Sequence, residues 1–319
     1  VHITSRNVHI LLEEDMQGVS QTRDLVGYGD TPPAWKLPGG AKLAVSMVVN
    51  FEEGAELAVS DGDPQAEKIS EVVSVVPPGR WDQGNEQIFA YGMRAGIWRM
   101  LAALEKHRRP VTFYMCGRAV ERLPQVARRI VAAGHEAACH GWLWRPHADY
   151  TERTEELRDL RRCIEVMESA TGRRPTGFFC RGSESRETRS ILRELDFGYA
   201  SNGFDDDLPY WDRSDAQHPL LVVPYALDSN DMKFFHPNGF VRADEMVDYV
   251  RDAIDMLLEE GEAGHPKLLN IGWHLRIAGR PGRFAAFKRV LALLDSYGEK
   301  VWIARRDEIA SSWREQFPA

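Results

Sequence analysis

Two adjacent glutamates, Glu52 and Glu53, have the residue type and spacing best suited to acid–base chemistry in this sequence. They follow the apolar, β-branched run Lys42–Val49, which predicts a buried strand that Gly54 ends with a turn. In α/β folds, ligands bind where loops leave the carboxyl ends of the strands. Two carboxylates held close together raise the pKa of at least one of them, which provides an acid or base for use near neutral pH. The commoner alternative is a solvated pair in a loop.

Other predicted strands also end in ionisable residues. His140, Arg181 and His274 come directly after the apolar runs 136–139, 176–180 and 267–273. The carboxyl ends of parallel strands in a β/α barrel meet on one face, so we expect these side chains to share a site with Glu52. A lone histidine is more often structural, but several ionisable residues in equivalent positions are a much rarer coincidence.

The order of apolar patterns predicts an α/β fold. The predicted strands are 42–49, 111–115, 136–139, 176–180, 220–226, 267–273 and 300–304, and helical patterns alternate with them. About seven β/α units without a linker favour a parallel barrel or a distorted version of one. We expect a polar N-terminal arm over residues 1–22 and a single domain over residues 23–319.

Composition restricts the possible partners. The net charge is −8, with 43% hydrophobic residues, which is typical of a globular protein and disfavours nucleic acids and anionic membranes as partners. No apolar run is long enough to span a membrane and no secretion signal is evident, so a cytoplasmic protein with a small-molecule substrate is expected. The four cysteines form no CxxC pair and are expected to be buried thiols.

Two features suggest self-association. The aromatic residues Tyr28, Trp35 and Trp81 lie in segments predicted to be irregular. Residues 60–85 form a long insertion. Such segments would expose apolar surface on a lone barrel, so a homo-oligomer, either a dimer or a tetramer, is expected. The alternative is that the insertion packs on its own barrel as a lid.

Several segments resemble motifs of the polysaccharide deacetylase superfamily. The run Asn50–Gly54 resembles its acidic first motif, Gly134–His140 its histidine motif, Arg181 its arginine motif and His274 its final histidine. The longer segments RDLVGYG, NFEEGAE, YGMRAGIWR, AAGHEAACHGW, DDDLPYW, LDSNDM, GWHLRIAGRPGR and VWIARRDEIA resemble the allantoinase and cyclic imide hydrolase branch of that superfamily. The resemblance runs from about Arg23 to the C-terminus and implies a polysaccharide-deacetylase-like barrel.

The sequence departs from typical deacetylases where those enzymes bind a metal. They carry two aspartates and a second histidine four residues after the first, whereas this chain has Glu52, Glu53 and, four residues after His140, Trp144. An open catalytic metal site needs three protein ligands, and Glu53 with His140 supplies two. The resemblance to a metal-independent branch agrees, so no cofactor is expected. If zinc binds, Glu53 and His140 are the expected ligands. His147 is not a dependable third ligand, because it is displaced from the motif position and follows Pro146.

The resemblance implies a hydrolase that opens a C–N bond in a small cyclic amide, an allantoin-like ureide or a cyclic imide. Glu52 is then the expected base, and Glu53 and His140 orient water or substrate. His274, with a pKa near neutrality, is the expected acid for the leaving nitrogen. The alternatives are a metal-dependent N-deacetylase of an acetylated sugar or glycan, and a binding module without activity.

A second group of residues is expected to bind the substrate: Asn50, Trp144, Arg181, Glu184, Trp273 and Arg280. The forked donors of Arg181 suit a substrate carbonyl or a developing negative charge. Glu184 lies where the allantoinase branch has a Gly-Arg-Thr run, and this extra carboxylate would change which ring fits. A structural ion pair is the favoured role of Arg276, Arg283 and Arg305.

Overall fold

The computed structural model describes residues 24–69 and 71–319, and residues 34–319 form one compact unit, whereas residues 24–33 lie outside it. The segment 1–22 lies outside the described residues, so the predicted boundaries of the arm and the domain remain predictions. Within the described residues, no helix has the length and apolar character needed to cross a membrane.

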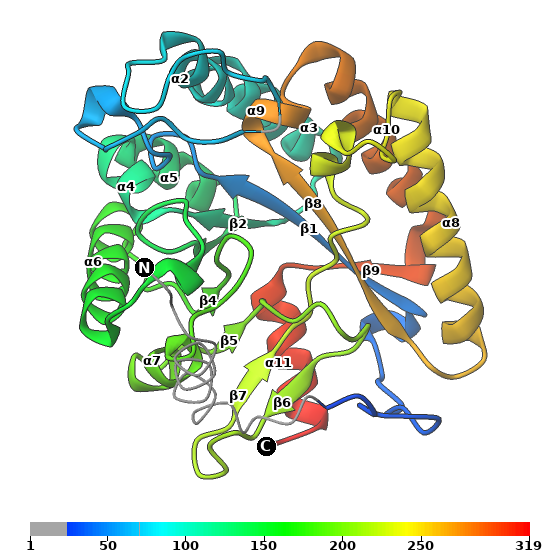
Figure 1. The fold of residues 1–319 in the computed structure, drawn as a ribbon. Helices are drawn as coiled ribbons and strands as arrows, with labels where there is room; N and C mark the ends of the chain where they lie inside the picture. The colour runs from blue at the N-terminus through cyan, green and yellow to red at the C-terminus, as the bar shows by residue number, and fades with distance from the viewer. Residues whose placement is uncertain (1–23, 70) are drawn as a thin grey trace, which may run out of the picture. The chain divides into compact units, whose positions relative to one another are not determined.

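One strongly curled sheet forms the centre of the compact unit (Figure 1). Its strands are β1 (Leu43–Phe51), β2 (Thr112–Met115), β3 (Glu136–Cys139), β4 (Gly177–Phe178), β5 (Tyr199–Ala200), β6 (Tyr210–Asp212), β7 (Leu220–Val222), β8 (Lys267–His274) and β9 (Val301–Ile303). The strand order is β6-β7-β5-β4-β3-β2-β1-β8, and β9 also pairs with β1. All pairs are parallel except β6 with β7. The predicted distorted α/β barrel is therefore confirmed, with two short strands, β5 and β6, that the sequence did not predict.

The strand β1 pairs with three other strands, β2, β8 and β9. All nine of its residues are buried, as its continuous apolar sequence predicts for a strand covered on both faces. It pairs with β8 along its length, in a register that places Asn50 opposite His274. On its other edge β9 pairs with the first half and β2 with the second half. This register brings the residues that follow β1 close to the end of β8.

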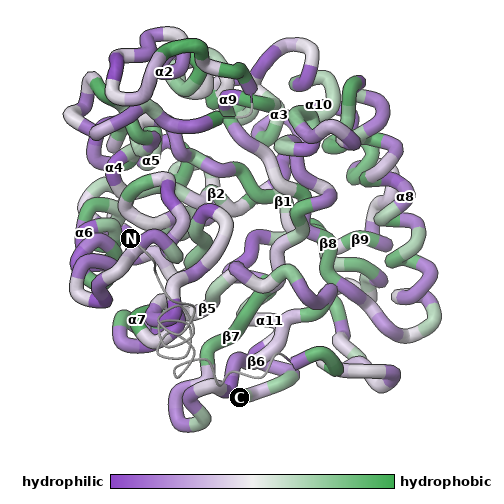
Figure 2. Tube along the Cα trace, in the orientation of Figure 1, coloured by the Kyte–Doolittle hydropathy of each residue, from purple (hydrophilic) through white to green (hydrophobic). Residues whose placement is uncertain are grey.

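Helices cover the outside of the curled sheet (Figure 1). They are α2 (Gln83–Tyr91), α3 (Ile97–His107), α4 (Gly117–Arg122), α5 (Pro124–Ala132), α6 (Arg153–Thr171), α7 (Thr188–Glu194), α8 (Ala243–Glu262), α9 (Leu275–Ala278), α10 (Pro281–Tyr297) and α11 (Arg306–Gln316). A π-helical turn, Gly92–Gly96, joins α2 to α3. The outer helices α6 and α8 alternate between hydrophobic and hydrophilic colour in Figure 2, because one face of each packs on the sheet.

The aromatic segments are only partly exposed. Trp35 is 1% exposed and packs edge-on against the rings of Trp302 and Trp313, so the prediction that Trp35 contributes exposed surface is wrong. The described part of the insertion, 60–69 and 71–85, packs on its own barrel through ion pairs with Arg118, Arg181 and Arg276, as a lid would. Trp81 in the same segment remains 59% exposed.

Candidate active site

The two glutamates leave β1 at a tight turn. Gly54 has a φ of 95°, a left-handed conformation that favours glycine, and the amide of Ala55 donates to the carbonyl of Glu52 at 2.8 Å. The predicted turn at Gly54 is therefore present. It keeps Glu52 and Glu53 inside the barrel, where each is only 1% exposed, so the alternative of a solvated pair is wrong.

The carboxylate of Glu52 lies at the centre of a buried cluster. Its Oε1 atom is 3.4 Å from Nε2 of His140 and 3.3 Å from Nε2 of His274. Its Oε2 atom accepts a hydrogen bond from Nη1 of Arg276 at 2.5 Å. Burial by itself raises the pKa of Glu52, but the positive charges of His274 and Arg276 outweigh burial and hold it well below its usual value. Glu52 is therefore ionised at neutral pH.

The orientation of His140 fixes its tautomer. Its Nδ1 atom lies 2.5 Å from the carbonyl oxygen of Phe179, which can only accept, so Nδ1 carries a proton. The ring also stacks on the Phe179 ring at 5.3 Å. The other ring nitrogen, Nε2, faces Oε1 of Glu52 at 3.4 Å, so a water molecule that contacts both atoms would be oriented by them.

His274 lies between two carboxylates. Its Nδ1 atom is 2.6 Å from Oδ1 of Asp231, and Oδ2 of Asp231 accepts from the backbone amide of His274 at 2.8 Å. Burial by itself lowers the pKa of His274, but attraction to Glu52 and Asp231 outweighs burial and raises it to about 10. The predicted pKa near neutrality is thus wrong, because Asp231 adds a second negative charge, and His274 is an imidazolium at neutral pH.

Glu53 is oriented away from the histidines. Its Oε1 atom accepts from the backbone amide of Arg276 at 3.0 Å, and its carboxyl lies against Gly92 of the π-helical turn, where any Cβ would overlap it. Burial, together with the negative charge of Glu52, raises the pKa of Glu53 to about 8 despite the opposing charge of Arg276. The expectation that the close approach of the two carboxylates raises the pKa of at least one of them is confirmed. Glu53 keeps its proton at neutral pH and Glu52 does not.

Arg276 forms an ion pair, as the sequence predicted, but its partner is Glu52, the proposed base. Besides Glu52, it contacts Glu71 of the insertion, with Nε 2.6 Å from Oε1. The guanidinium lies 4.6 Å from the ring centroids of both Phe89 and Trp144. Its Nη2 atom is buried and has no hydrogen-bond partner among the described residues. That nitrogen is therefore available to a substrate carbonyl or oxyanion.

Trp144 connects the cluster to Arg181. The guanidinium of Arg181 lies 3.8 Å from the Trp144 ring centroid, and its Nη1 atom donates to Oε1 of Glu67 at 2.9 Å. Arg181 has no direct contact with Glu52, Glu53, His140 or His274 among the described residues. A direct role of Arg181 at the reacting atoms therefore has no contact to support it, and Arg181 instead holds the insertion against Trp144.

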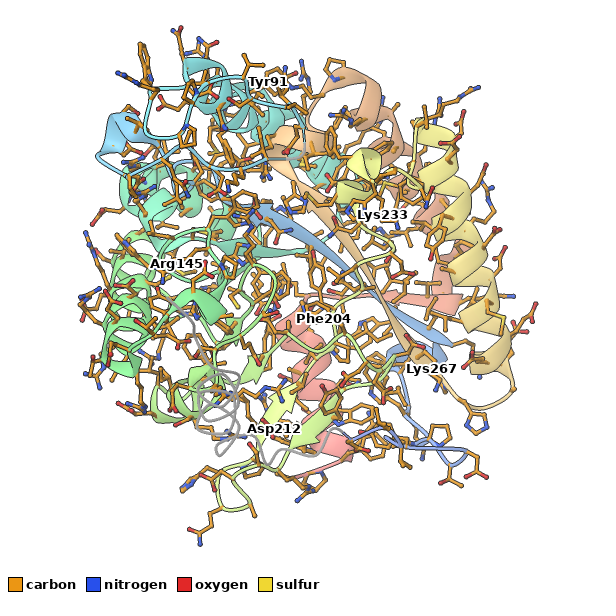
Figure 3. The ribbon with its side chains drawn as sticks, in the orientation of Figure 1. Tyr91, Arg145, Phe204, Asp212, Lys233 and Lys267 are labelled. Atoms are coloured by element: carbon orange, nitrogen blue, oxygen red, sulfur yellow. The ribbon has the colours of Figure 1, made fainter. Side chains whose placement is uncertain are left out.

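The other predicted residues lie in three different places. Asn50 donates through Nδ2 to the carbonyl of Trp273 at 3.2 Å, beside Nε2 of His274, while the Trp273 side chain belongs to the core. Glu184 is paired with Arg189 at 2.8 Å, and Arg189 also pairs with Asp212, which is labelled in Figure 3 near β6. Arg280 stacks on Tyr91, also labelled in Figure 3, and lines a cavity next to Arg276.

The residues present do not fit a three-ligand metal site. No cluster of three or more His, Cys, Asp or Glu side chains in the described chain could hold a metal ion. His147, the possible third ligand, is held by Glu156 at 2.8 Å, with its Nε2 atom directed at Gly141. Oε2 of Glu52 is already occupied by the guanidinium of Arg276.

Sequence reasoning did not assign Asp231 or Arg276 to the site. Both could have been found from their positions in the sequence. Asp231 follows the predicted strand 220–226, in the SNDM segment, and Arg276 is two residues beyond His274. The contact between Glu71 and Arg276 had no comparable signal, because Glu71 lies in an irregular segment.

Comparisons with known proteins agree with this arrangement. The family model described as polysaccharide deacetylase matches residues 83–200. A Schizosaccharomyces pombe protein named "Putative polysaccharide deacetylase" is 35% identical, over 93% of this chain and 98% of its own length.

Two crystal structures resemble the whole fold. The probable polysaccharide deacetylase from Pseudomonas aeruginosa PAO1 is 40% identical, with a TM-score of 0.88 over 93% of this chain and 99% of that chain. The allantoinase PuuE is 38% identical, with a TM-score of 0.89 over 94% of this chain and 100% of that chain. This chain therefore belongs to the polysaccharide deacetylase family.

Proposed function

We propose that this protein is a hydrolase that opens a C–N bond in a small cyclic amide, an allantoin-like ureide or a cyclic imide, without a metal. The observation that carries the proposal is the buried carboxylate of Glu52, with Nε2 of His140 and of His274 both within 3.4 Å of Oε1. The likeness to the allantoinase PuuE over 94% of this chain and 100% of that chain supports this choice of substrate class.

The proposed chemistry starts with water held between Glu52 and His140. As water attacks the ring carbonyl, Glu52 accepts its proton, and the free Nη2 of Arg276 stabilises the oxyanion. His274 then donates its proton to the leaving nitrogen, which becomes strongly basic as the C–N bond breaks. Loss of that proton removes a positive charge 3.3 Å from Glu52, which favours the protonated form that Glu52 has already reached by accepting the proton from water.

The second candidate is metal-dependent N-deacetylation of an acetylated sugar or glycan. The name of the Pseudomonas relative favours it. The donor set opposes it, since Trp144 replaces the second histidine expected of such a site and stacks under Arg181.

A substrate panel separates the two candidates. We expect the purified protein to hydrolyse at least one of allantoin, hydantoin and succinimide, with or without a chelator, and to leave N-acetylglucosamine oligomers intact. Glu52→Gln is the control for a contaminating hydrolase. Deacetylation of the sugar that depends on added zinc, with no ring opening, would establish the second candidate instead.

The four cysteines are buried and free, as predicted, with Sγ of Cys139 3.4 Å from Sγ of Cys163. These unbonded neighbouring thiols support a reducing compartment, so our proposal includes the cytoplasm as the site of action.

A further inference from the structure

A cavity of about 740 Å³ lies next to the Glu52 site, and arginines dominate its wall. Five arginines line it: Arg242, Arg276, Arg280, Arg283 and Arg289. Among the residues that the structure describes, two carboxylates, Glu71 and Asp244, line the same cavity. The lining of the cavity is therefore positively charged, whereas the whole chain carries a net charge of −8.

The two carboxylates are already paired. Asp244 contacts Arg289 and, at 3.4 Å, Arg242, while Glu71 contacts Arg276 at 2.6 Å. Arg280 and Arg283 have no carboxylate within ion-pair distance in the part of the chain that the structure describes. The structural ion pair favoured for Arg283 is therefore not present, whereas the one favoured for Arg305 is, with Asp307 at 3.0 Å.

Aromatic rings hold these two guanidinium groups in place. Arg280 lies 3.6 Å from the Tyr91 ring centroid and Arg283 lies 4.4 Å from that of Phe235. Arg280 is the N-cap of the 17-residue helix α10 and Arg283 lies in its first turn, where the helix dipole also favours an anion. Burial lowers the pKa of Arg283, a cost that a bound anion would offset.

Arg276 joins this cavity to the reacting centre. One of its terminal nitrogens, Nη1, contacts Glu52, and the other, Nη2, is buried without a partner in the described chain. A ligand in the cavity can therefore contact the same guanidinium that holds the proposed base.

We propose that this cavity binds a carboxylate side chain of the substrate, so that the rings opened are cyclic ureides or imides with an acidic substituent. This inference rests on the proposed function. The forked donors of Arg280 and Arg283 match a carboxylate. The two coplanar oxygens of a carboxylate match the paired donors of one guanidinium group, and a carboxylate is an anion that a small cyclic ureide or imide can carry as a substituent.

The first test compares two rings that differ in one charge. Hydantoin-5-acetate carries the carboxylate, and 5-(carbamoylmethyl)hydantoin replaces it with a neutral amide of similar size. We expect kcat/KM to favour the acid, and Arg280→Gln and Arg283→Gln each to reduce this preference by roughly 10- to 100-fold, the effect of one charged hydrogen bond. Arg283→Lys should restore part of it. The control Arg251→Gln, an exposed residue of α8 paired with Asp248, should retain the native preference.

The second test needs no turnover. We expect titration calorimetry of the native protein to detect succinate binding, stronger than that of inorganic phosphate, and the Arg280→Gln/Arg283→Gln double variant to lose it while keeping its melting temperature. Binding of succinate without ring opening would overturn the proposed function and support the anion site. Ring opening with no preference for the acid, or a preference unchanged in both variants, would overturn the anion site and leave the proposed function intact.

Discussion

Oε1 of Glu52 and Nε2 of His274 lie 3.3 Å apart, and the opposite nitrogen of the same imidazole lies 2.6 Å from Asp231. One buried imidazolium thus separates two buried carboxylates. This arrangement stabilises the charged forms of Glu52 and His274, and it makes the proton on His274 the link between the proposed base and the leaving group.

The first prediction is that replacement of Glu52, the proposed base, lowers turnover. Glu52→Gln keeps the volume of the side chain but cannot accept a proton, so we expect turnover to fall by roughly 10²–10⁴-fold with a small change in KM. Steady-state kinetics measures this, with Glu105→Gln, an exposed residue of α3, as the control. A folded Glu52→Gln protein with native turnover would falsify the assignment.

Glu53 gives a prediction about stability and pH. The folded protein keeps the Glu53 proton up to about pH 8, whereas the unfolded chain releases it near 4.5. The folded state therefore binds the extra proton between these values, and the free energy of unfolding due to this group decreases as pH rises through that interval. Glu53→Gln has no proton to lose. We expect the melting temperature of the native protein to fall relative to that of the variant between about pH 5 and pH 8. A constant difference across that range would mean that Glu53 is ionised in the folded protein.

Asp231 should control the pH profile through His274. Because Asp231 contributes to the raised pKa of His274, about 10 in the native protein, Asp231→Asn should lower that pKa. We expect the alkaline limb of kcat/KM to move to lower pH in Asp231→Asn. His274→Ala should lose the limb and roughly 10²–10⁴-fold in turnover. An alkaline limb at the same pH in both variants would assign the acid to another group.

Metal independence is a prediction of the donor set. We expect the purified protein to contain no stoichiometric zinc by elemental analysis, and its rate on a cyclic amide to be the same after dialysis against a strong chelator. One tightly held ion per chain, lost together with activity and restored with it, would contradict this.

Self-association remains a prediction from exposed apolar residues. Val73 and Val75, in the insertion, are 89% and 93% exposed, and Trp81 is 59% exposed. We expect a dimer or tetramer by light scattering at micromolar concentration, and Val73→Glu with Val75→Glu to dissociate it without a change in melting temperature at low concentration. A native monomer would instead show that the insertion serves only as a lid.

The strands were the most predictable part of the structure. All seven predicted strands are present because each lies in a short apolar run, and β1, β2, β4 and β7 are buried along their whole length. The strands β5 and β6 were missed because they lie in the segment 198–215, where Gly, Asp, Asn and Pro interrupt every apolar run. The curling of the sheet comes from pairing between distant strands and has no local signal.

The part of the candidate site that could be predicted consists of side chains that directly follow parallel strands. Glu52, His140 and His274 were correctly expected to converge, because each follows a parallel strand. Arg181 was expected to join them and does not, because Glu67 and Trp144 hold it. The raised pKa of His274 could not be anticipated, since it depends on Asp231, which is 43 residues away in sequence.

The pairing of β1 with β8 and β9, the last two strands of the chain, also has a consequence for biosynthesis. Asn50 at the end of β1 pairs with His274, 224 residues later, and the first half of β1 pairs with β9, which is later still (Figure 1). During translation the first strand must therefore wait, with one or both edges unpaired, until nearly the whole chain has left the ribosome. An unpaired apolar strand of nine residues is prone to aggregation, so synthesis of this protein should depend on chaperones that shield residues 43–51.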